Sequence, residues 1–279
     1  MRSRAISTPS IARVFFAFLF ACFFACLFGL AACGVAPGLN EPSRDAGSDG
    51  AVASGLPPPY QLFYNLTSIS ADENTITLRT ADLPDHKTPF YGKGSASYEA
   101  YNGTNPNFST AINLMGRISD PVLAAQDVSF RIPRNPKVAA THAATGLGPI
   151  GIALNGVILF NQYNGMRALL DTLEINNMDQ YNGHPTPAPA LQYHYHMEPL
   201  YLTKTRGGGA LVGFLLDGFP VYGPVEGGKR LSSAMLDKYH GHEHATAEYP
   251  NGIYHYHCTD DAPWLNGEGY YGTPGTVTR

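Results

Sequence analysis

The chain has 279 residues, enough for one substantial domain with appended segments, and it carries 18 basic and 22 acidic residues. Three of the basic residues and none of the acidic ones precede Cys33, so the remainder has a net charge of 15 − 22 = −7. This negative balance argues against nucleic acid or an anionic membrane surface as the partner of the folded part.

The N-terminus has the order of an export signal. Arg2, Arg4 and Arg13 precede an uncharged apolar run over 14–32, which ends in Leu30-Ala31-Ala32-Cys33. A branched residue, two small residues and a cysteine form a bacterial lipobox, which predicts that residues 1–33 are a lipoprotein signal and that Cys33 is acylated. The alternative is a retained membrane helix, since the run is long enough to span a bilayer.

Residues 34–58 are rich in Gly, Pro, Ala, Ser and Asp, which predicts a flexible tether, and one domain over 59–279. The expected location is the bacterial cell envelope, with the lipid at Cys33 in the outer membrane's periplasmic face or at the cell surface. Two of the four cysteines lie in the signal and a third is the acylated one, so Cys258 has no intrachain disulfide partner.

Short strand signals follow one another along the domain. Residues 75–79 and 128–132 alternate apolar and polar side chains, which is typical of half-buried strands. Residues 150–160 and 211–222 each have apolar stretches around Asn155-Gly156 or Asp217-Gly218, dipeptides that favour tight hairpin turns.

Helix signals are few. Residues 166–174 place Met166, Leu169, Leu170 and Leu173 on one face, and 232–239 is a second candidate. The sequence therefore predicts a mainly β fold, a single domain of short strands and long loops with one or two short helices, and an internal pseudo-repeat in its C-terminal half.

That repeat is the strongest signal in the chain. The template Asp-x-Tyr-x-Gly-His followed by Tyr-His-Tyr-His occurs at 179–184 with 193–196, and again at 237–242 with 254–257. Eight matching positions in the same order indicate two related structural units.

In a strand, alternate side chains share a face, so both histidines of Tyr-His-Tyr-His point one way and both tyrosines the other. Two such strands are expected to bring four imidazoles to one common point: His194, His196, His255 and His257. Imidazole is the usual ligand of zinc and copper, so the sequence predicts a copper or zinc ion as cofactor, with His184 as a further ligand.

The aspartates of the template have two possible roles. Asp179 and Asp237 could ligate the ion or orient its histidines, or they could cap backbone amides in turns. Gly183 and Gly241 are expected to allow a tight turn that aims the next histidine inward. His240 and His244 lie in a polar loop and are expected to be exposed, and Cys258 is expected to be a buried thiol, with copper(I) ligation as the alternative.

These motifs resemble the YHYH protein family, named after the tetrapeptide. The resemblance covers most of residues 75–275 through a series of short motifs at 83–88, 105–107, 148–157, 182–185, 217–224, 236–237, 249–252 and 272–274. It implies an exported domain without an assigned reaction. It favours His86 as a further site residue, with a turn residue as the alternative. His242 is an alternative ligand, which the resemblance weakens because members often carry arginine at its position. Tyr181 and Tyr239 stand where members often carry cysteine, and if those cysteines pair with each other the resemblance implies that the two halves are neighbours in space.

Two functions are consistent with the sequence. The first is a metal-binding protein, in which three protein ligands would leave a position open for water or substrate and Asp217 or Asp179 could act as a base. The second is a non-catalytic surface module that binds carbohydrate or peptide, with the histidines as structural groups. No nucleophile or phosphate-loop motif is present, so whether the protein is an enzyme stays open at this point.

Overall fold

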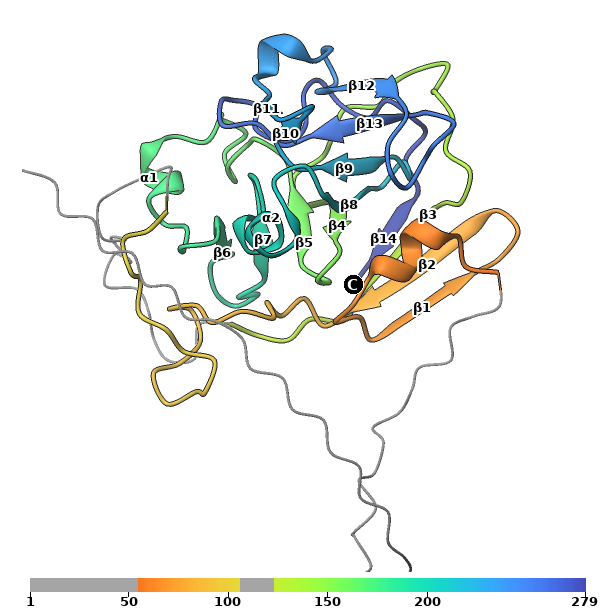
Figure 1. Cartoon of the computed structure of the whole chain (residues 1–279). Coiled ribbons are helices and arrows are strands. Elements are labelled where there is room, and N and C mark those ends of the chain that lie inside the picture. The colour runs from red at the N-terminus through yellow and green to blue at the C-terminus, as the bar shows by residue number, and fades with distance from the viewer. Residues whose placement is uncertain (1–54, 106–122) are drawn as a thin grey trace, which may run out of the picture. The chain divides into compact units, whose positions relative to one another are not determined.

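The computed structural model describes residues 55–105 and 123–279, all of which lie in one compact unit, Asp49–Arg279 (Figure 1). These residues contain 14 strands in three sheets and little helix, which confirms the predicted mainly β fold. In chain order the elements are η1 (Pro58–Leu62), β1 (Ser68–Ala71), β2 (Thr75–Thr80), β3 (Val128–Pro133), β4 (Pro149–Ala153), β5 (Ile158–Phe160), α1 (Thr172–Ile175), β6 (Gly183–Pro185), β7 (Tyr193–Tyr195), α2 (Leu200–Arg206), β8 (Leu211–Leu215), β9 (Pro220–Tyr222), β10 (Val225–Glu226), β11 (Lys229–Arg230), η2 (Ser233–Met235), β12 (Gly241–His244), β13 (Ile253–His257) and β14 (Thr276–Thr278).

The largest sheet has eight strands in the order β12-β13-β9-β8-β4-β5-β7-β6. Its two halves have the same strand pairing. In each half the second strand of a hairpin (β5 of β4-β5, or β9 of β8-β9) pairs in parallel with a tetrapeptide strand (β7 or β13). That strand in turn pairs antiparallel with an edge strand (β6 or β12). The halves meet where β4 pairs with β8, with Ile152 opposite Phe214. The sheet is therefore built from two copies of one four-stranded unit.

The repeat is longer than the sequence template suggested. Gly151 opposes Leu215 and Ala153 opposes Gly213, as a two-fold axis through the Ile152–Phe214 pair requires. Under that relation the turn of the β4-β5 hairpin corresponds to the turn of the β8-β9 hairpin, and Asn155 corresponds to Asp217. Both predicted hairpins are confirmed, with Gly156 (φ +77°) and Gly218 (φ +83°) supplying the left-handed backbone that their turns need.

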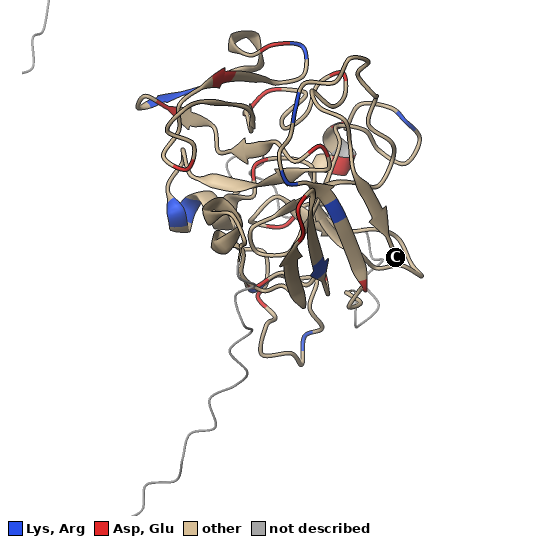
Figure 2. Cartoon of the chain, turned by 90° about the vertical axis from the view of Figure 1, so that its right-hand side faces the viewer, with Lys and Arg blue, Asp and Glu red and all other residues tan. Residues whose placement is uncertain are grey.

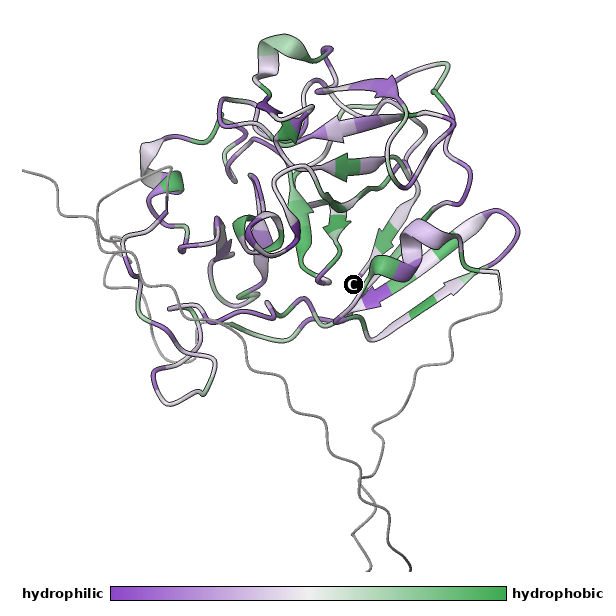
Figure 3. Cartoon of the chain, in the orientation of Figure 1, coloured by the Kyte–Doolittle hydropathy of each residue, from purple (hydrophilic) through white to green (hydrophobic). Residues whose placement is uncertain are grey.

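The four strands at the centre of this sheet, β9, β8, β4 and β5, carry no charged residue, and most of their length is green in Figure 3. Charged residues lie mainly in loops and near strand ends (Figure 2). A second sheet has the order β1-β2-β3-β14, and apolar side chains of both sheets, such as Ile76, Phe130, Ile152 and Phe214, belong to one buried core. Burial of these apolar side chains is the main source of stability in such a fold.

The helix predicted over 166–174 is wrong except at its end, where α1 covers Thr172–Ile175. The side-chain oxygen of Asn164 accepts hydrogen bonds from the backbone amides of Met166 and Ala168. Arg167 between them has a φ of +62°, which is not helical. This local turn competes with the helix and leaves Met166 88% exposed. The candidate at 232–239 is reduced to the single turn of η2.

Helix α2 was not predicted, although its ends carry ordinary signals. Pro199 precedes it, Lys204 and Arg206 lie in its last turn, and Gly207 follows with a φ of +108°. Leu56 is already buried in the main core cluster. Within the described residues, no helix combines the length and the apolar character needed to cross a membrane. Cys33, the signal and most of the motif at 105–107 lie outside the described residues.

Candidate metal centres

The two tetrapeptide strands present their tyrosines to the core, as alternation predicts. Tyr193, Tyr195, Tyr254 and Tyr256 all belong to the main core cluster. The histidines between them point to the opposite face of the sheet, where they meet other histidines.

The two strands do not, however, bring their histidines to one common point. Strands β7 and β13 are separated by four other strands, so they are about 24 Å apart at the usual strand spacing. The expectation of a single shared site for the four tetrapeptide histidines is wrong. Each copy instead forms its own cluster, since the edge strand next to each tetrapeptide supplies a further histidine: His184 on β6 opposes His194, and His242 on β12 opposes His255.

The closed cluster consists of His184, His194 and His196. One ring nitrogen of each lies within 4.8 Å of the others, and all three side chains are buried. The Nε2 atoms of His194 and His196 are 3.0 Å apart. Glu174 on α1 places Oε1 3.9 Å from Nε2 of His184, which has no hydrogen-bond partner. The cluster is therefore a compact set of three imidazoles with one carboxylate beside it.

The hydrogen bonds fix the tautomers in this cluster. Nδ1 of His194 donates to the carbonyl of Gln192 at 3.0 Å, and Nδ1 of His196 donates to the carbonyl of Asn161 at 2.5 Å. Carbonyls only accept, so each Nδ1 carries a proton and each Nε2 of a neutral ring presents a lone pair. Burial keeps the rings neutral: it lowers the pKa of His196 to about 4, and together with the neighbouring histidines it holds the pKa of His194 well below its usual value.

Two lone pairs at 3.0 Å repel each other, because neither ring has a proton to share. A cation between them turns this repulsion into coordination. Two nitrogens bound to one tetrahedral zinc ion at about 2.0–2.1 Å would lie roughly 3.3 Å apart, close to the separation observed here. In His184 burial is again the larger cause and lowers the pKa to about 3, so this ring too is neutral and able to ligate.

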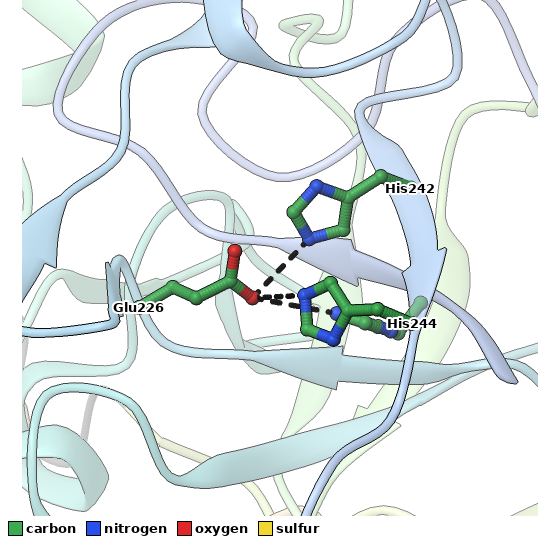
Figure 4. A group of neighbouring side chains, drawn as sticks. Glu226, His242 and His244 are labelled. Carbon is green, nitrogen blue, oxygen red and sulfur yellow. Dashed lines mark hydrogen bonds and ion pairs between the residues drawn. The ribbon is translucent and has the colours of Figure 1, made fainter. Parts of the chain in front are cut away.

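The open cluster consists of Glu226, His242, His244, His255 and His257. Oε1 of Glu226 lies 3.3 Å from Nε2 of His242, 3.4 Å from that of His257 and 3.8 Å from that of His255. It also bonds to Nε2 of His244. Figure 4 shows this carboxylate oxygen facing the rings of His242 and His244. Four imidazole nitrogens thus surround one oxygen atom.

The open cluster repeats the tautomers of the closed one. Nδ1 of His255 donates to the carbonyl two residues before it, Ile253, as His194 does in the first copy. Nδ1 of His257 donates to the carbonyl of Gly223, which follows β9 just as Asn161 follows β5. The Nε2 atoms of His242 and His257 are 3.1 Å apart. Both copies therefore direct ring lone pairs inward.

The two clusters differ in their access to solvent. The side chains of His242, His244 and Glu226 are 27%, 40% and 30% exposed, whereas His184 in the closed cluster is 7% exposed. Burial lowers the pKa of His255 to about 4 and also lowers that of His257, so the inner part of the open cluster is neutral as well. An ion in the open cluster would be reachable from outside the protein, and one in the closed cluster would not.

Three residues of these clusters were missed from the sequence. Glu174 and Glu226 lie in the segments that each copy inserts between its hairpin and its edge strand, and no spacing signals them. His244 was expected to be merely exposed, but it lies two residues after His242 on β12 and so shares its face. His240 is buried, contrary to expectation, and bonds to Ser233 and to the carbonyl of His257.

The candidate aspartates lie on the tyrosine face, away from both clusters. Asp179 accepts the hydroxyl of Tyr193 at 2.7 Å, and Asp237 accepts that of Tyr254 at 2.9 Å. Both also cap the amides of the turn that follows them. Their expected role beside the ion is wrong, and the capping alternative is the one that the structure supports.

His86 and Asp217 also lie on the tyrosine face. Nε2 of His86 is 3.1 Å from the hydroxyl of Tyr195, and Asp217 accepts the hydroxyl of Tyr256 at 2.6 Å. Neither belongs to a metal-ligand group among the described residues, so the expected roles of His86 as ligand and of Asp217 as base are not supported. Cys258 is a fully buried free thiol in the core, and burial raises its pKa well above the usual value, as expected for an inert thiol.

The glycines of the template act differently from the prediction. Neither Gly183 nor Gly241 has a positive φ. A Cβ atom at Gly183 would overlap the hydroxyl of Tyr193, and one at Gly241 would overlap the hydroxyl of Tyr254. The glycines therefore make room for the first tyrosine of each tetrapeptide, which crosses over them to reach its aspartate.

The chain matches the model of the YHYH protein family over residues 129–230 and 225–268, and it belongs to this family. The matched part contains both hairpins, both tetrapeptides and both histidine clusters. No curated protein and no solved structure matches the chain.

Proposed function

We propose that this protein binds transition-metal ions, one in each histidine cluster, with zinc or copper as the ion. The observation that carries the proposal is that the Nε2 atoms of His194 and His196 face each other at 3.0 Å while Nδ1 of each ring lies against a backbone carbonyl. Buried histidines that serve only as hydrogen-bonding partners need a proton on one of two facing nitrogens. In these two rings the proton is instead on Nδ1, where the N–H group donates a hydrogen bond to a backbone carbonyl.

The ligand chemistry favours the same group of metals. Imidazole nitrogens suit zinc, copper, iron and nickel, and they are poor ligands for magnesium and calcium. Each tautomer is fixed by an Nδ1–H bond to a carbonyl, which is the outer arrangement that metal-bound histidines usually have. The surface-module alternative gives no reason for this arrangement to occur twice.

We further propose that the domain works outside the cytoplasm, held to a membrane by a lipid on Cys33. The lipobox and the preceding apolar run support this. Fractionation of cells that express the wild type and Cys33→Ser tests it: the wild type is expected in the membrane fraction and the variant in the soluble fraction. Equal membrane retention of both would overturn it.

The metal proposal is tested by elemental analysis of the purified full-length protein, saturated with zinc or copper and then dialysed. Two ions per chain are expected, and one each in His194→Ala and His255→Ala. His86→Ala, a buried histidine on the tyrosine face, is the matched control and keeps two. A wild type that binds no ion while its circular dichroism shows a folded β protein would overturn the proposal.

A further inference from the structure

We infer that the two centres have divided roles: the closed cluster holds a permanent ion, and the open cluster holds an exchangeable ion that accepts an external oxygen-donor ligand in place of Glu226. This inference rests on the proposed metal binding and adds to it the class of ligand and the residue that regulates its access. It is carried by differences between two copies that otherwise share their fold and tautomers.

The first difference is the number of donors. The closed cluster offers three imidazoles, with the Glu174 carboxylate 3.9 Å from the nearest. The open cluster offers four imidazoles and one carboxylate oxygen within 3.8 Å of the nitrogens. The three imidazoles and the Glu174 carboxylate are the four donors that complete a tetrahedral ion, whereas five donors suit an ion that can expand its coordination.

The extra imidazole comes from His244. In the first copy the edge strand β6 runs Gly183-His184-Pro185 and is followed by Thr186, and in the second β12 runs Gly241-His242-Glu243-His244. Thr186 therefore holds the position that corresponds to His244, and it bonds to the amide of Gln192 rather than to the cluster. Only the second copy has a histidine at the solvent-facing end of its site.

The second difference is the element of secondary structure on which the carboxylate lies. Glu226 lies on β10, which pairs only with β11 in a separate two-stranded ribbon. The turn of this ribbon consists of Gly227 and Gly228. No other atom lies within 4 Å of the position that a Cβ atom would take at either glycine, so the turn projects into open space. The Glu226 side chain is 30% exposed, so it can turn outward without disturbing the core. Glu174, by contrast, sits on helix α1 beside a buried histidine.

The class of ligand follows from what Glu226 occupies. Its Oε1 lies among the four nitrogens, so an ion bound by them would have this carboxylate beside it, and the carboxylate oxygen would fill one of the ion's coordination positions. A place that accepts one carboxylate oxygen from a partly exposed side chain fits the oxygen of a small carboxylate from solution equally well. The external ligand is therefore expected to compete with Glu226 for the same position.

The experiment uses full-length protein loaded with Co²⁺, whose visible absorption reports changes in its ligands. Acetate is titrated into the wild type, Glu226→Ala, His244→Thr and Glu174→Ala. We expect a saturable spectral change in the wild type. We expect acetate to bind at least about tenfold more tightly to Glu226→Ala, or ~1.4 kcal/mol, because the competing carboxylate is gone. Glu174→Ala, the matched control in the closed cluster, should respond as the wild type does.

Chelator challenge gives the second readout. One ion should leave the wild type rapidly and the other at least about tenfold more slowly. In His244→Thr the spectral response to acetate should be weakened or lost, while the slowly released ion stays bound. Two ions that leave at one rate, or an acetate response that is unchanged in Glu226→Ala, would overturn this inference while leaving metal binding intact. Absence of any bound Co²⁺ in folded protein would instead overturn the proposed function on which it rests.

Discussion

The hydroxyl of Tyr256 donates a 2.6 Å hydrogen bond to the carboxylate of Asp217, which is fully buried and also accepts a hydrogen bond from the amide of Gly272. In the first copy the corresponding pair is reversed, because the side chain of Asn155 donates to the hydroxyl of Tyr195 at 3.2 Å. The same turn position thus holds a charge in one copy and a neutral amide in the other. Because the first copy has an asparagine at this turn position, the second copy is expected to accommodate Asp217→Asn.

Asp217 should make stability depend on pH. Burial is the main cause that raises its pKa from 3.8 to about 6, so the folded protein holds this proton more tightly than the unfolded chain. The resulting stabilisation is fully present below about pH 4 and is lost as pH rises through about 6. Relative to the wild type, Asp217→Asn should therefore become more stable by up to about 3 kcal/mol between pH 4 and pH 7. Urea unfolding of both proteins across this range measures the difference, and a constant difference would contradict the shift.

The aspartates of the two templates should differ in their contribution to stability. Asp179 is fully buried and accepts the hydroxyls of Tyr193 and Thr88 as well as two turn amides. Asp237 is exposed and accepts one hydroxyl and two amides. We expect Asp179→Ala to lower the free energy of unfolding by about 3 kcal/mol and Asp237→Ala by about 1 kcal/mol, because Asp179 is buried whereas Asp237 is exposed, where water can take over its hydrogen bonds.

Metal content distinguishes this structural role from ligation. Both aspartate variants should still bind two ions per folded chain, since their carboxylates lie on the tyrosine face. Elemental analysis at a temperature where each variant is folded provides the check. Loss of one ion in Asp179→Ala with full circular dichroism would mean that the carboxylate reaches the closed cluster after all.

The template glycines should be intolerant of any side chain. Alanine at Gly183 would overlap Tyr193, and alanine at Gly241 would overlap both Tyr254 and the backbone of His255. A side-chain ring can shift more easily than backbone, so Gly241→Ala should cost more than Gly183→Ala, with both in the range of about 1–3 kcal/mol or more. Tyr254→Phe removes only the hydroxyl and should partly restore Gly241→Ala. Thermal unfolding of the two single variants and the double variant tests this, and an unaffected Gly241→Ala would contradict it.

The features predicted from sequence are the local ones. Alternation placed β2, β3 and the tetrapeptide strands, and Asn155-Gly156 and Asp217-Gly218 marked the two hairpins, because side-chain period and turn chemistry act within a few residues. The repeat also pointed to His184 on the edge strand β6, and it offered His242 on β12 only as an alternative ligand. The helix over 166–174 failed because Asn164 caps a turn inside it.

The arrangement of the site was not predictable in the same way. Whether two strands with the same motif lie side by side or four strands apart depends on the pairing of β4 with β8, which joins residues far apart in the chain. Glu226 enters its cluster from a ribbon inserted between β9 and β12, and nothing in its neighbourhood marks it. The sequence thus predicted which histidines gather in clusters better than it predicted how they are grouped.

Removal of metal should weaken the folded protein chiefly through the closed cluster. Without an ion, the facing lone pairs of His194 and His196 stay buried at 3.0 Å, and Nε2 of His184 keeps no partner. Binding at a free ion concentration 100-fold above the dissociation constant adds about 2.7 kcal/mol per site, so zinc should raise the unfolding temperature and a chelator should lower it. Because the ligands of the closed cluster are the more deeply buried, His194→Ala should lose more of this response than His255→Ala. Differential scanning fluorimetry with and without chelator measures it. An equal response to zinc in the wild type and in a variant that carries both His194→Ala and His255→Ala would show that the ion binds elsewhere.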